Sequence, residues 1–412
     1  MSREDIILPE LFRPTAQLKI SLTPDCNNDC PICLNKTTRS RNAEKNGRLS
    51  IYMIRRLIDE ASDLGMIGVY WTGGEPLIEY RNLLELSNYS SKRGLIPTIV
   101  TNGGLIGAYG NYKKLNQPLL ERAGLFHLDT RQIVGSLKEA GITRIYFSVD
   151  SSHTTLESVY SDVYNIVPAE AVSQGIRGFL EEGYGKIHGL EAIGHQLRVT
   201  STSSGPLKRP TNIIFGKVME KAGLKLKKEL SAQARVFGNE KGEILLKQLD
   251  IASLGDAKTL DHDSLENRAG QNLFGIRCPH FLPRENAFDA GKHHGDLFIH
   301  HDGTLYTCGN HAYPVGNVFE ESLSSIIRGI NRPDSRGNFS LTRKVYHSLL
   351  TLSRQEDIGD KVLGEAFRLI YARYPKLLNN IKTQCGACSC LGHQKDLQEA
   401  FLEVFKKHYS LS

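Results

Sequence analysis

Cysteine is the residue type whose number and spacing in this chain could do chemistry. The chain has 412 residues and eight cysteines, and the range 34–277 contains none of them. The opening segment MSREDIILPE is charged and lacks the apolar core of a signal peptide, so we expect a cytoplasmic protein. In that reducing compartment, clustered cysteines favour metal ligands or catalytic thiols over disulfides.

The first cysteine group is Cys26-x3-Cys30-x2-Cys33, which follows a predicted strand at 18–23. Three thiolates this close can bind one face of a [4Fe–4S] cluster and leave the fourth iron open to a ligand that is not protein. A structural zinc ion needs four ligands, and the next several residues add no cysteine or histidine. The spacing favours an iron–sulfur cluster, with a zinc knuckle or buried thiols as the alternatives.

A second motif, Gly73-Gly74-Glu75-Pro76, follows the apolar residues of a second strand segment at 67–76. The two motifs in this order resemble the radical S-adenosylmethionine (radical SAM) enzymes, over about residues 17–237. The resemblance implies an α/β fold with a partial (β/α)6 TIM-type barrel, and a [4Fe–4S] cluster whose open iron chelates S-adenosylmethionine (SAM). It also implies reductive cleavage of SAM to a 5′-deoxyadenosyl radical, which abstracts hydrogen from a C–H bond.

The resemblance carries over to individual residues. Cys26, Cys30 and Cys33 are the implied cluster ligands. The implied SAM-binding residues are Gly73, Gly74, Glu75, Pro76, Asn102, Ser148, Asp150 and Arg198. For Asn102 a turn-forming asparagine is the alternative, and for Arg198 it is a surface or structural salt bridge. The chain departs from the family at Ile32, where an aromatic residue is frequent, which alters the packing on the adenine side.

The five remaining cysteines resemble the SPASM and shorter twitch extensions of radical SAM enzymes, which hold auxiliary iron–sulfur clusters. Five cysteines suffice for one four-ligand [4Fe–4S] cluster, for which we select Cys278, Cys308, Cys385 and Cys388. Cys390 is then spare. It is an alternative ligand, an inert thiol, or a hydrogen-atom donor to a substrate radical, as radical epimerisation requires.

Apolar strands alternate with amphipathic helices over about 200 residues, which predicts a parallel sheet. Helices are expected at 50–64, 131–141, 167–183 and 211–223, and strands at 18–23, 67–76, 96–104, 142–150 and 195–204. A hairpin at 295–308 with an exposed His-Asp-Gly turn and helices at 340–381 and 394–408 complete the prediction. We divide the chain into a lead-in (1–16), a barrel (17–237), a linker (238–275) and a small α+β auxiliary-cluster domain (276–412).

The composition excludes some partners and leaves the substrate open. A formal net charge of +6 over 412 residues is too dilute for a nucleic-acid binder, and no apolar run approaches the ~18 residues of a membrane span. We favour a small-molecule substrate (a sugar, nucleoside or amino-acid derivative) because we expect no leader-binding domain before residue 17. A ribosomal peptide substrate and a non-catalytic electron-transfer protein are the alternatives. The radical SAM reading requires an external one-electron donor of flavodoxin or ferredoxin type.

Overall fold

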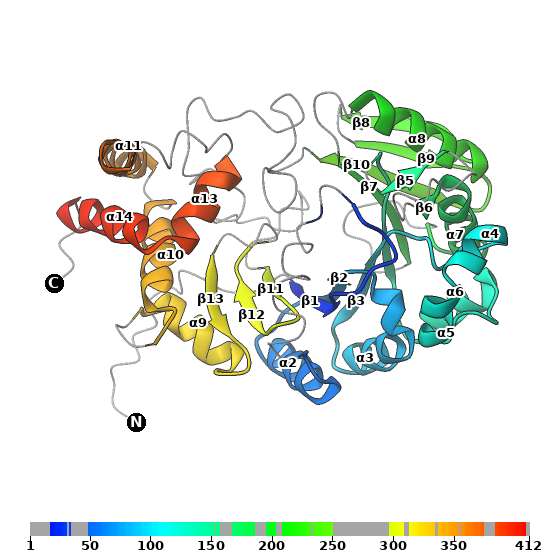
Figure 1. Cartoon of the computed structure of the whole chain (residues 1–412), viewed down its shortest axis with the longest axis horizontal. Helices are drawn as coiled ribbons and strands as arrows, with labels where there is room; N and C mark the ends of the chain where they lie inside the picture. The colour runs from blue at the N-terminus through cyan, green and yellow to red at the C-terminus, as the bar shows by residue number, and fades with distance from the viewer. Residues whose placement is uncertain are drawn as a thin grey trace.

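The computed structural model describes residues 17–30, 33, 48–151, 153–156, 167–185, 195–202, 208–231, 234–249, 296–308, 313–333, 337–353, 356–374 and 384–408. Its central feature is one sheet with the strand order β13-β12-β11-β1-β2-β3-β4-β7-β10-β9-β8 (Figure 1). These strands are β1 (Gln17–Thr23), β2 (Gly68–Gly73), β3 (Ile96–Thr101), β4 (Arg144–Ser148), β7 (Gln196–Thr202), β8 (Lys225–Ser231), β9 (Ala234–Gly238), β10 (Glu243–Leu249), β11 (Leu297–Ile299), β12 (Thr304–Tyr306) and β13 (Pro314–Asn317). The expected α/β class is confirmed.

The middle of the sheet is parallel, and its edges are antiparallel. Neighbouring strands from β11 through β1, β2, β3, β4 and β7 to β10 pair in parallel, while β12 and β13 at one end and β9 and β8 at the other pair antiparallel. In Figure 1 the sheet is curved, so that β7 to β10 stand above β1 to β3. A separate two-stranded sheet joins β5 (Thr154–Thr155) to β6 (Val167–Pro168). All parallel strands therefore present their carboxyl ends at one edge.

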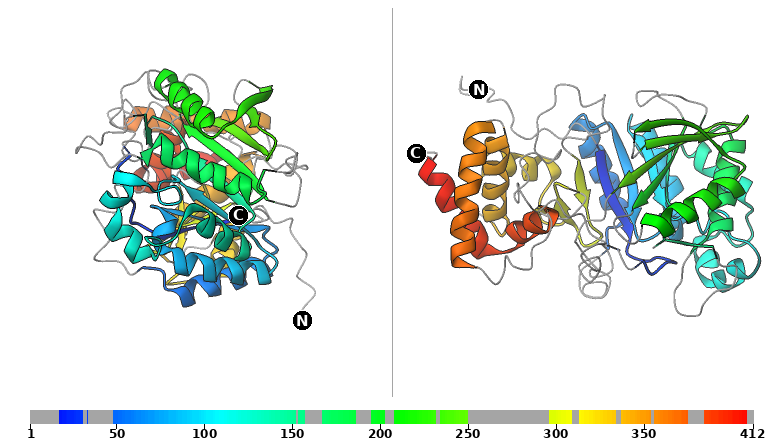
Figure 2. Two further views of the ribbon diagram at one scale, coloured as in Figure 1. Left: turned by 90° about the vertical axis from the view of Figure 1, so that its right-hand side faces the viewer. Right: turned by 90° about the horizontal axis from the view of Figure 1, so that it is seen from above.

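The helices cover one face of the sheet and form a layer beyond β13. Those of the first part are α2 (Ile51–Asp63), η1 (Pro76–Glu79), α3 (Tyr80–Lys92), α4 (Gly110–Leu115), α5 (Gln117–Ala123), α6 (Thr130–Glu139), α7 (Ala169–Glu181) and α8 (Lys208–Lys221). Those of the last part are α9 (Leu323–Asn331), α10 (Ser340–Ser353), α11 (Glu356–Arg373), α13 (Gln384–His393) and α14 (Lys395–His408), which gather at the opposite end of the molecule from α7 and α8 (Figure 2). In the described residues no helix is both long and apolar enough to span a bilayer.

Local signals account for the element boundaries. Ser50 caps α2, and its hydroxyl accepts a hydrogen bond from the Met53 N–H at 3.2 Å. Asp129 and Gln132 form a capping box at the start of α6, and Gly141 follows its end with a φ of 84°. The expected strands and helices between 18 and 223 are all present with shifted ends, and α3, α4 and α5 were not predicted.

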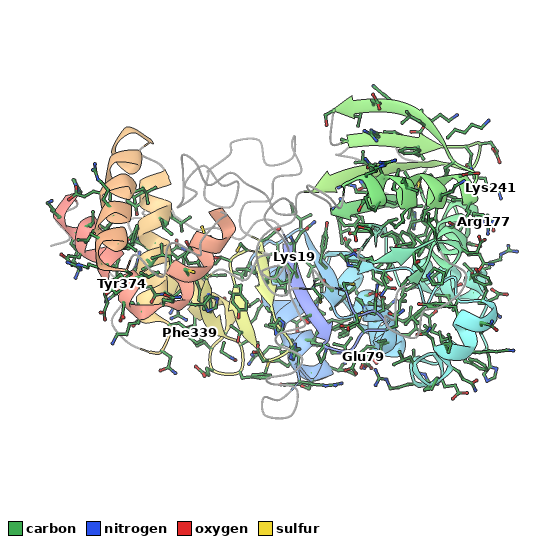
Figure 3. All side chains as sticks on the ribbon, turned by 45° about the horizontal axis from the view of Figure 1, so that its top comes forward. Lys19, Glu79, Arg177, Lys241, Phe339 and Tyr374 are labelled. Carbon is green, nitrogen blue, oxygen red and sulfur yellow. The ribbon has the colours of Figure 1, made fainter. Side chains whose placement is uncertain are left out.

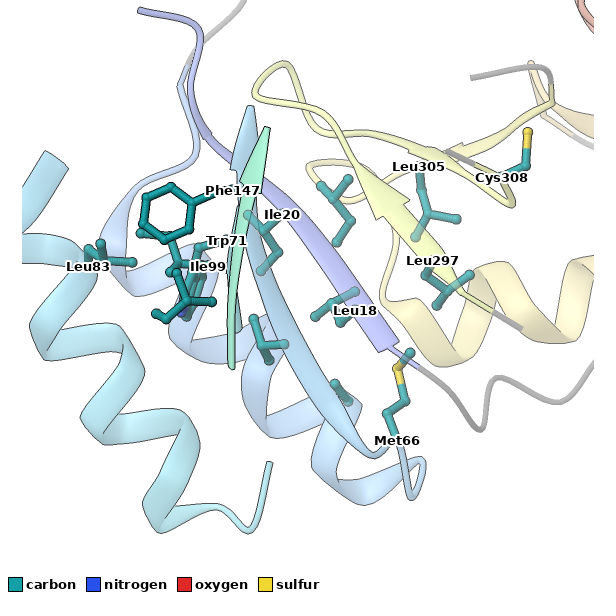
Figure 4. Packing of buried hydrophobic residues seen from close by; sticks show 14 of the residues in the cluster. Leu18, Ile20, Met66, Trp71, Leu83, Ile99, Phe147, Leu297, Leu305 and Cys308 are labelled. Atoms are coloured by element: carbon teal, nitrogen blue, oxygen red, sulfur yellow. The ribbon is translucent and has the colours of Figure 1, made fainter. Parts of the chain in front are cut away.

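The sheet has an apolar face and a polar face because its side chains alternate. Leu18, Trp71, Ile99 and Phe147 are fully buried and pack with the helices in a continuous hydrophobic core. Figure 4 shows Trp71 and Ile99 between the strands and Leu83 of α3. Trp71 is the single tryptophan of the chain, and it packs in this core. The alternate positions, such as Lys19 and Tyr146, lie on the other face.

The C-terminal part differs from the prediction in two ways. β10 lies in the range 238–275 expected as a linker and pairs with β7, so residues 243–249 extend the sheet. The hairpin is confirmed as β11 and β12, but its His-Asp-Gly turn is not exposed, since His300 is 1% and His301 2% exposed. The turn is buried because β11 inserts beside β1. Burial and the neighbouring His300 lower the pKa of His301 to about 4.

Candidate functional site

The loop after β1 and the Gly73–Pro76 turn after β2 are joined by backbone hydrogen bonds. Gly74 N–H donates to the Thr23 carbonyl at 2.7 Å, and Glu75 N–H donates to the Asp25 carbonyl at 2.8 Å. This approach requires glycine, because a Cβ on Gly74 would lie 1.9 Å from the Asp25 oxygen. The two sequence motifs therefore lie side by side at the carboxyl edge of the sheet.

Glu75 is buried at the centre of this edge. Its carboxylate accepts hydrogen bonds from the Leu77 N–H at 3.2 Å, the Thr101 hydroxyl at 2.8 Å and the Asn102 N–H at 2.9 Å. Burial raises the pKa of Glu75 to about 7, and the three hydrogen bonds oppose that rise. Glu75 thus links the turn to the end of β3 and can bind or release a proton near neutral pH.

Asn102 connects this carboxylate to the cysteine loop. Its side-chain amide donates to Asn27 Oδ1 at 2.8 Å and lies 3.8 Å from Cys26 Sγ, while its Oδ1 accepts from the Gly104 N–H at 2.9 Å. Asn27 in turn donates to the Tyr112 hydroxyl at 2.7 Å. Asn102 is therefore a turn former, as the alternative interpretation predicts, and its side chain lies beside Cys26, while its binding of SAM stays a prediction.

A second network holds Cys30. Asp150, which is fully buried beyond the end of β4, accepts from His153 Nδ1 at 2.9 Å and from its backbone N–H at 3.1 Å. His153 also hydrogen-bonds the Cys30 thiol. Burial lowers the pKa of His153, but the Asp150 and Cys30 charges outweigh it and hold the pKa well above its ordinary value. His153 is thus a positioning residue for the loop.

Sequence reasoning missed Asn27, Asn28 and His153. Asn28 donates to the His153 carbonyl at 3.0 Å and, like Asn27, is buried. The Asn-Asn pair directly after Cys26 was the available signal, because buried amides inside a loop need partners. For His153 no pattern was available, since its contact with Cys30 depends on the fold.

The other predicted residues lie apart from this centre. Ser148 ends β4 and is half-buried at the same edge. Arg198 is the third residue of β7, and its guanidinium lies 5.3 Å from the centre of the Tyr146 ring. Pro76 is buried at the start of η1, and Gly73 has a φ of 117°.

The predicted auxiliary cysteines are only partly described. Cys278 lies outside the described residues, and Cys385 lies in α13. Cys308 follows β12 and Cys388 lies in α13, and both side chains are buried. The pKa of the buried Tyr313 is raised well above its ordinary value by burial and by the charges of Cys388 and Cys308, which places both cysteines in its electrostatic environment. None of the six cysteines with described side chains forms a disulfide.

The helix separates Cys390 from its neighbours. On α13, Cys385 and Cys388 stand three residues apart in the sequence, and Cys390 is about 200° around the helix from Cys388. Cys390 is half-buried and packs against the hydrophobic core. The last three cysteines therefore lie on a helix, not between helices as expected.

The donor set suits an iron–sulfur cluster in type and position. Three thiols share one loop at the edge of the sheet, next to a turn that only glycine can form. Within the described residues, however, no three His, Cys, Asp or Glu side chains converge on a metal-sized site, and Cys30 contacts His153 instead. Cluster binding would require the three sulfurs to turn toward one point.

Comparison with known proteins identifies this part of the chain. The family model of the radical SAM superfamily matches residues 20–190. This region is a radical SAM domain. Members of the superfamily are enzymes, and the family implies a [4Fe–4S] cluster and SAM.

The relatives of this radical SAM domain carry the names of enzymes with different substrates. The chain is 33% identical over 136 residues to a GTP 3′,8-cyclase of Syntrophomonas wolfei (32% of this chain, 34% of the relative). It is 30% identical over 135 residues to a PqqA peptide cyclase of Gluconobacter oxydans, with the same coverage of 32% and 34%. The matches therefore span about a third of each relative's length. The structure of native anSMEcpe with bound AdoMet covers 96% of both chains at 12% identity and a TM-score of 0.45.

Proposed function

We propose that this protein is a radical SAM enzyme that acts on a polar small molecule. The observation that carries the proposal is the hydrogen-bonded junction of the Cys26–Cys33 loop and the Gly73–Pro76 turn, inside the domain that the family model matches. When bound, the cluster and SAM would together supply a 5′-deoxyadenosyl radical for hydrogen abstraction. The protein's own groups position the cofactors and exclude water.

Each part of the edge has a proposed role. Cys26, Cys30 and Cys33 would hold the cluster, and the backbone of Gly73 and Gly74 would receive the SAM amino group. Glu75 would position that turn through its bonds to the ends of β2 and β3. Asp150 would keep His153 against the cysteine loop rather than bind ribose directly. The curvature and parallel order of the sheet support our proposal of a partial (β/α)6 barrel.

The experiment is anaerobic reconstitution with iron and sulfide, reduction with dithionite, and addition of SAM. We expect 5′-deoxyadenosine, measured by mass spectrometry, at a level that depends on all three loop cysteines. Absence of the nucleoside from a preparation with a full iron content would refute the proposal and favour an electron-transfer protein.

We also propose an auxiliary [4Fe–4S] cluster, held by Cys278, Cys308, Cys385 and Cys388. The burial of Cys308 and Cys388 and their common electrostatic effect on Tyr313 support it. Such a cluster could accept an electron from a substrate radical and so favour net oxidation. Cys390 would instead serve epimerisation as a hydrogen-atom donor, in which case Cys390→Ala yields a desaturated or trapped product while SAM cleavage continues.

A peptide substrate is the second candidate. The match to a PqqA peptide cyclase favours it as much as the match to a GTP 3′,8-cyclase favours a nucleotide. The chemistry of the polar sheet face separates the two candidates.

A further inference from the structure

From β1 to β7 the polar face of the parallel sheet carries cations and no acidic side chain, whereas Asp296 before β11 and Glu243 of β10 lie on the same face at its two flanks. Alternation and register assign to this face Gln17, Lys19, Ser21, Gly68, Tyr70, Thr72, Ile96, Thr98, Val100, Arg144, Tyr146, Ser148, Gln196, Arg198 and Thr200. Lys19 is neutralised, since its Nζ lies 2.6 Å from Asp296 Oδ2. Figure 3 shows Lys19 near the middle of the molecule, whereas Arg177 and Lys241 lie at the periphery.

Two guanidinium groups on this face have no carboxylate partner among the described residues. Arg144 and Arg198 are half-buried on the adjacent strands β4 and β7, and the contact of Arg198 is with the face of Tyr146 at 5.3 Å. A half-buried cation pair without an anion is costly, because each charge loses solvation and repels the other. The pair thus lacks its counter-charge within the described part of the chain.

Tyrosine hydroxyls complete the arrangement. Tyr70 and Tyr146 meet edge to face across β3, with ring centres 5.5 Å apart. Burial and the neighbouring Tyr146 raise the pKa of Tyr70 well above its ordinary value, while the charges of Arg198 and Arg144 oppose that rise. The tyrosines are neutral donors beside two fixed cations.

An unsatisfied polar atom marks the same place. Thr98 is fully buried, and its hydroxyl has no hydrogen-bond partner in the described structure. Thr98 pairs in register with Tyr70 on one side and Arg144 on the other. A buried hydroxyl that lacks a partner costs free energy, which a bound oxygen atom would recover.

We propose that Arg144, Arg198, Tyr70 and Thr98 bind an oxyanion of the substrate, a phosphate or a carboxylate. The site lies deeper than the cofactor edge: Arg198 precedes the end of β7 at Thr202 by four residues, or about 13 Å. A substrate anchored there by its charged group would extend toward the edge, where the proposed function requires its reacting carbon. The inference rests on that proposed function and narrows its substrate class to anionic small molecules.

Binding of inorganic phosphate and of acetate to the reconstituted protein, followed anaerobically by calorimetry at constant salt, tests the site. We expect the wild-type protein to bind at least one of them. We expect Arg144→Gln and Arg198→Gln to weaken binding about tenfold or more, and Thr98→Val, which keeps the side-chain shape, to weaken it about threefold. The matched control is Arg131→Gln, whose side chain is 84% exposed on α6 and which should bind as the wild type does.

Binding of phosphate or of acetate shows whether the site prefers a phosphate or a carboxylate group. If the wild-type protein binds neither anion, the inference is overturned. Equal binding by wild type and Thr98→Val would overturn the assigned location even if an arginine variant failed to fold. Loss of phosphate binding on addition of SAM would assign the arginines to the SAM carboxylate and would also overturn it. Wild-type release of 5′-deoxyadenosine is measured in parallel without any substrate. If 5′-deoxyadenosine is released but no anion binds, only this inference fails. If anions bind but no 5′-deoxyadenosine is released, only the proposed function fails.

Discussion

Replacing Glu75 by glutamine tests the buried carboxyl group at the junction of the two motifs. The group has a pKa of about 7 in the folded protein, against an ordinary value of 4.5. The folded state therefore holds a proton that the unfolded state releases, and stability falls as pH rises through this window. From about pH 5.5 to about pH 8 the group should lower the free energy of unfolding by about 2 kcal/mol.

The variant should lose this pH dependence, and its free energy of unfolding should be lowered by an amount that does not change with pH. Glutamine keeps one oxygen for the Leu77 N–H and the Thr101 hydroxyl, but it places an amide donor against the Asn102 N–H. An unsatisfied buried donor costs about 1–3 kcal/mol. We therefore expect Glu75→Gln to be less stable than the wild type at about pH 5.5 and nearly equal to it at about pH 8.

The assay is urea unfolding of both proteins at the two pH values, anaerobically and without SAM. The quantity of interest is the change with pH in the stability difference between the two proteins, because other titrating groups cancel in it. Thr101→Val is the companion variant. It removes one hydrogen bond that lowers the Glu75 pKa and should shift the transition to higher pH. A stability difference that is the same at both pH values would refute the reasoning.

Three further predictions concern the edge, the proposed second cluster and the core. Gly74→Ala should abolish SAM binding measured by calorimetry, because its Cβ would meet the Asp25 carbonyl, whereas Gly135→Ala on α6, where no atom lies within 4 Å, should bind normally; equal binding by both variants would contradict this. Cys388→Ala should lower the iron content from about eight to about four per chain, with Cys390→Ala unchanged, and equal iron in both would argue against the ligand assignment. Tyr184→Phe should lower the free energy of unfolding in urea by about 1–2 kcal/mol, because the buried hydroxyl donates to the Ile142 carbonyl, and an unchanged value would contradict this.

Sequence reasoning succeeded where a local pattern determines the structure. Residues 51–63 repeat apolar side chains at helical spacing after a capping serine, and α2 forms there. The two motifs follow neighbouring strands of a predicted parallel sheet, and the hydrogen bonds from Gly74 and Glu75 to the first loop show that they meet at one edge. Sequence reasoning failed where the structure depends on pairing between strands that are distant in the sequence. Nothing local indicates that β10 joins β7, or that the His-Asp-Gly turn is buried beside β1.

On the polar face of the sheet, too, the sequence predicts which residues share a face but not which of them come into contact. The alternation in LKISLT and RIYFS indicates that Lys19, Arg144 and Tyr146 lie opposite the core, but the prediction treated these segments only as apolar strands. The meeting of Tyr70 and Tyr146 across β3 depends on strand order, which the sequence does not state. Contacts of this kind become readable only when the order of the strands is known.

The pairing of β1 with β11 has a consequence for how the chain folds. Leu18 pairs with Leu297, so one edge of β1 forms its hydrogen bonds with a strand that follows it by more than half the length of the sequence. During synthesis that edge of β1 would be exposed until β11 emerges, and exposed strand edges invite pairing with other chains. Contacts between residues that are far apart in the sequence also slow folding. A chain truncated before β11 should therefore aggregate, even though both cofactor motifs would be intact.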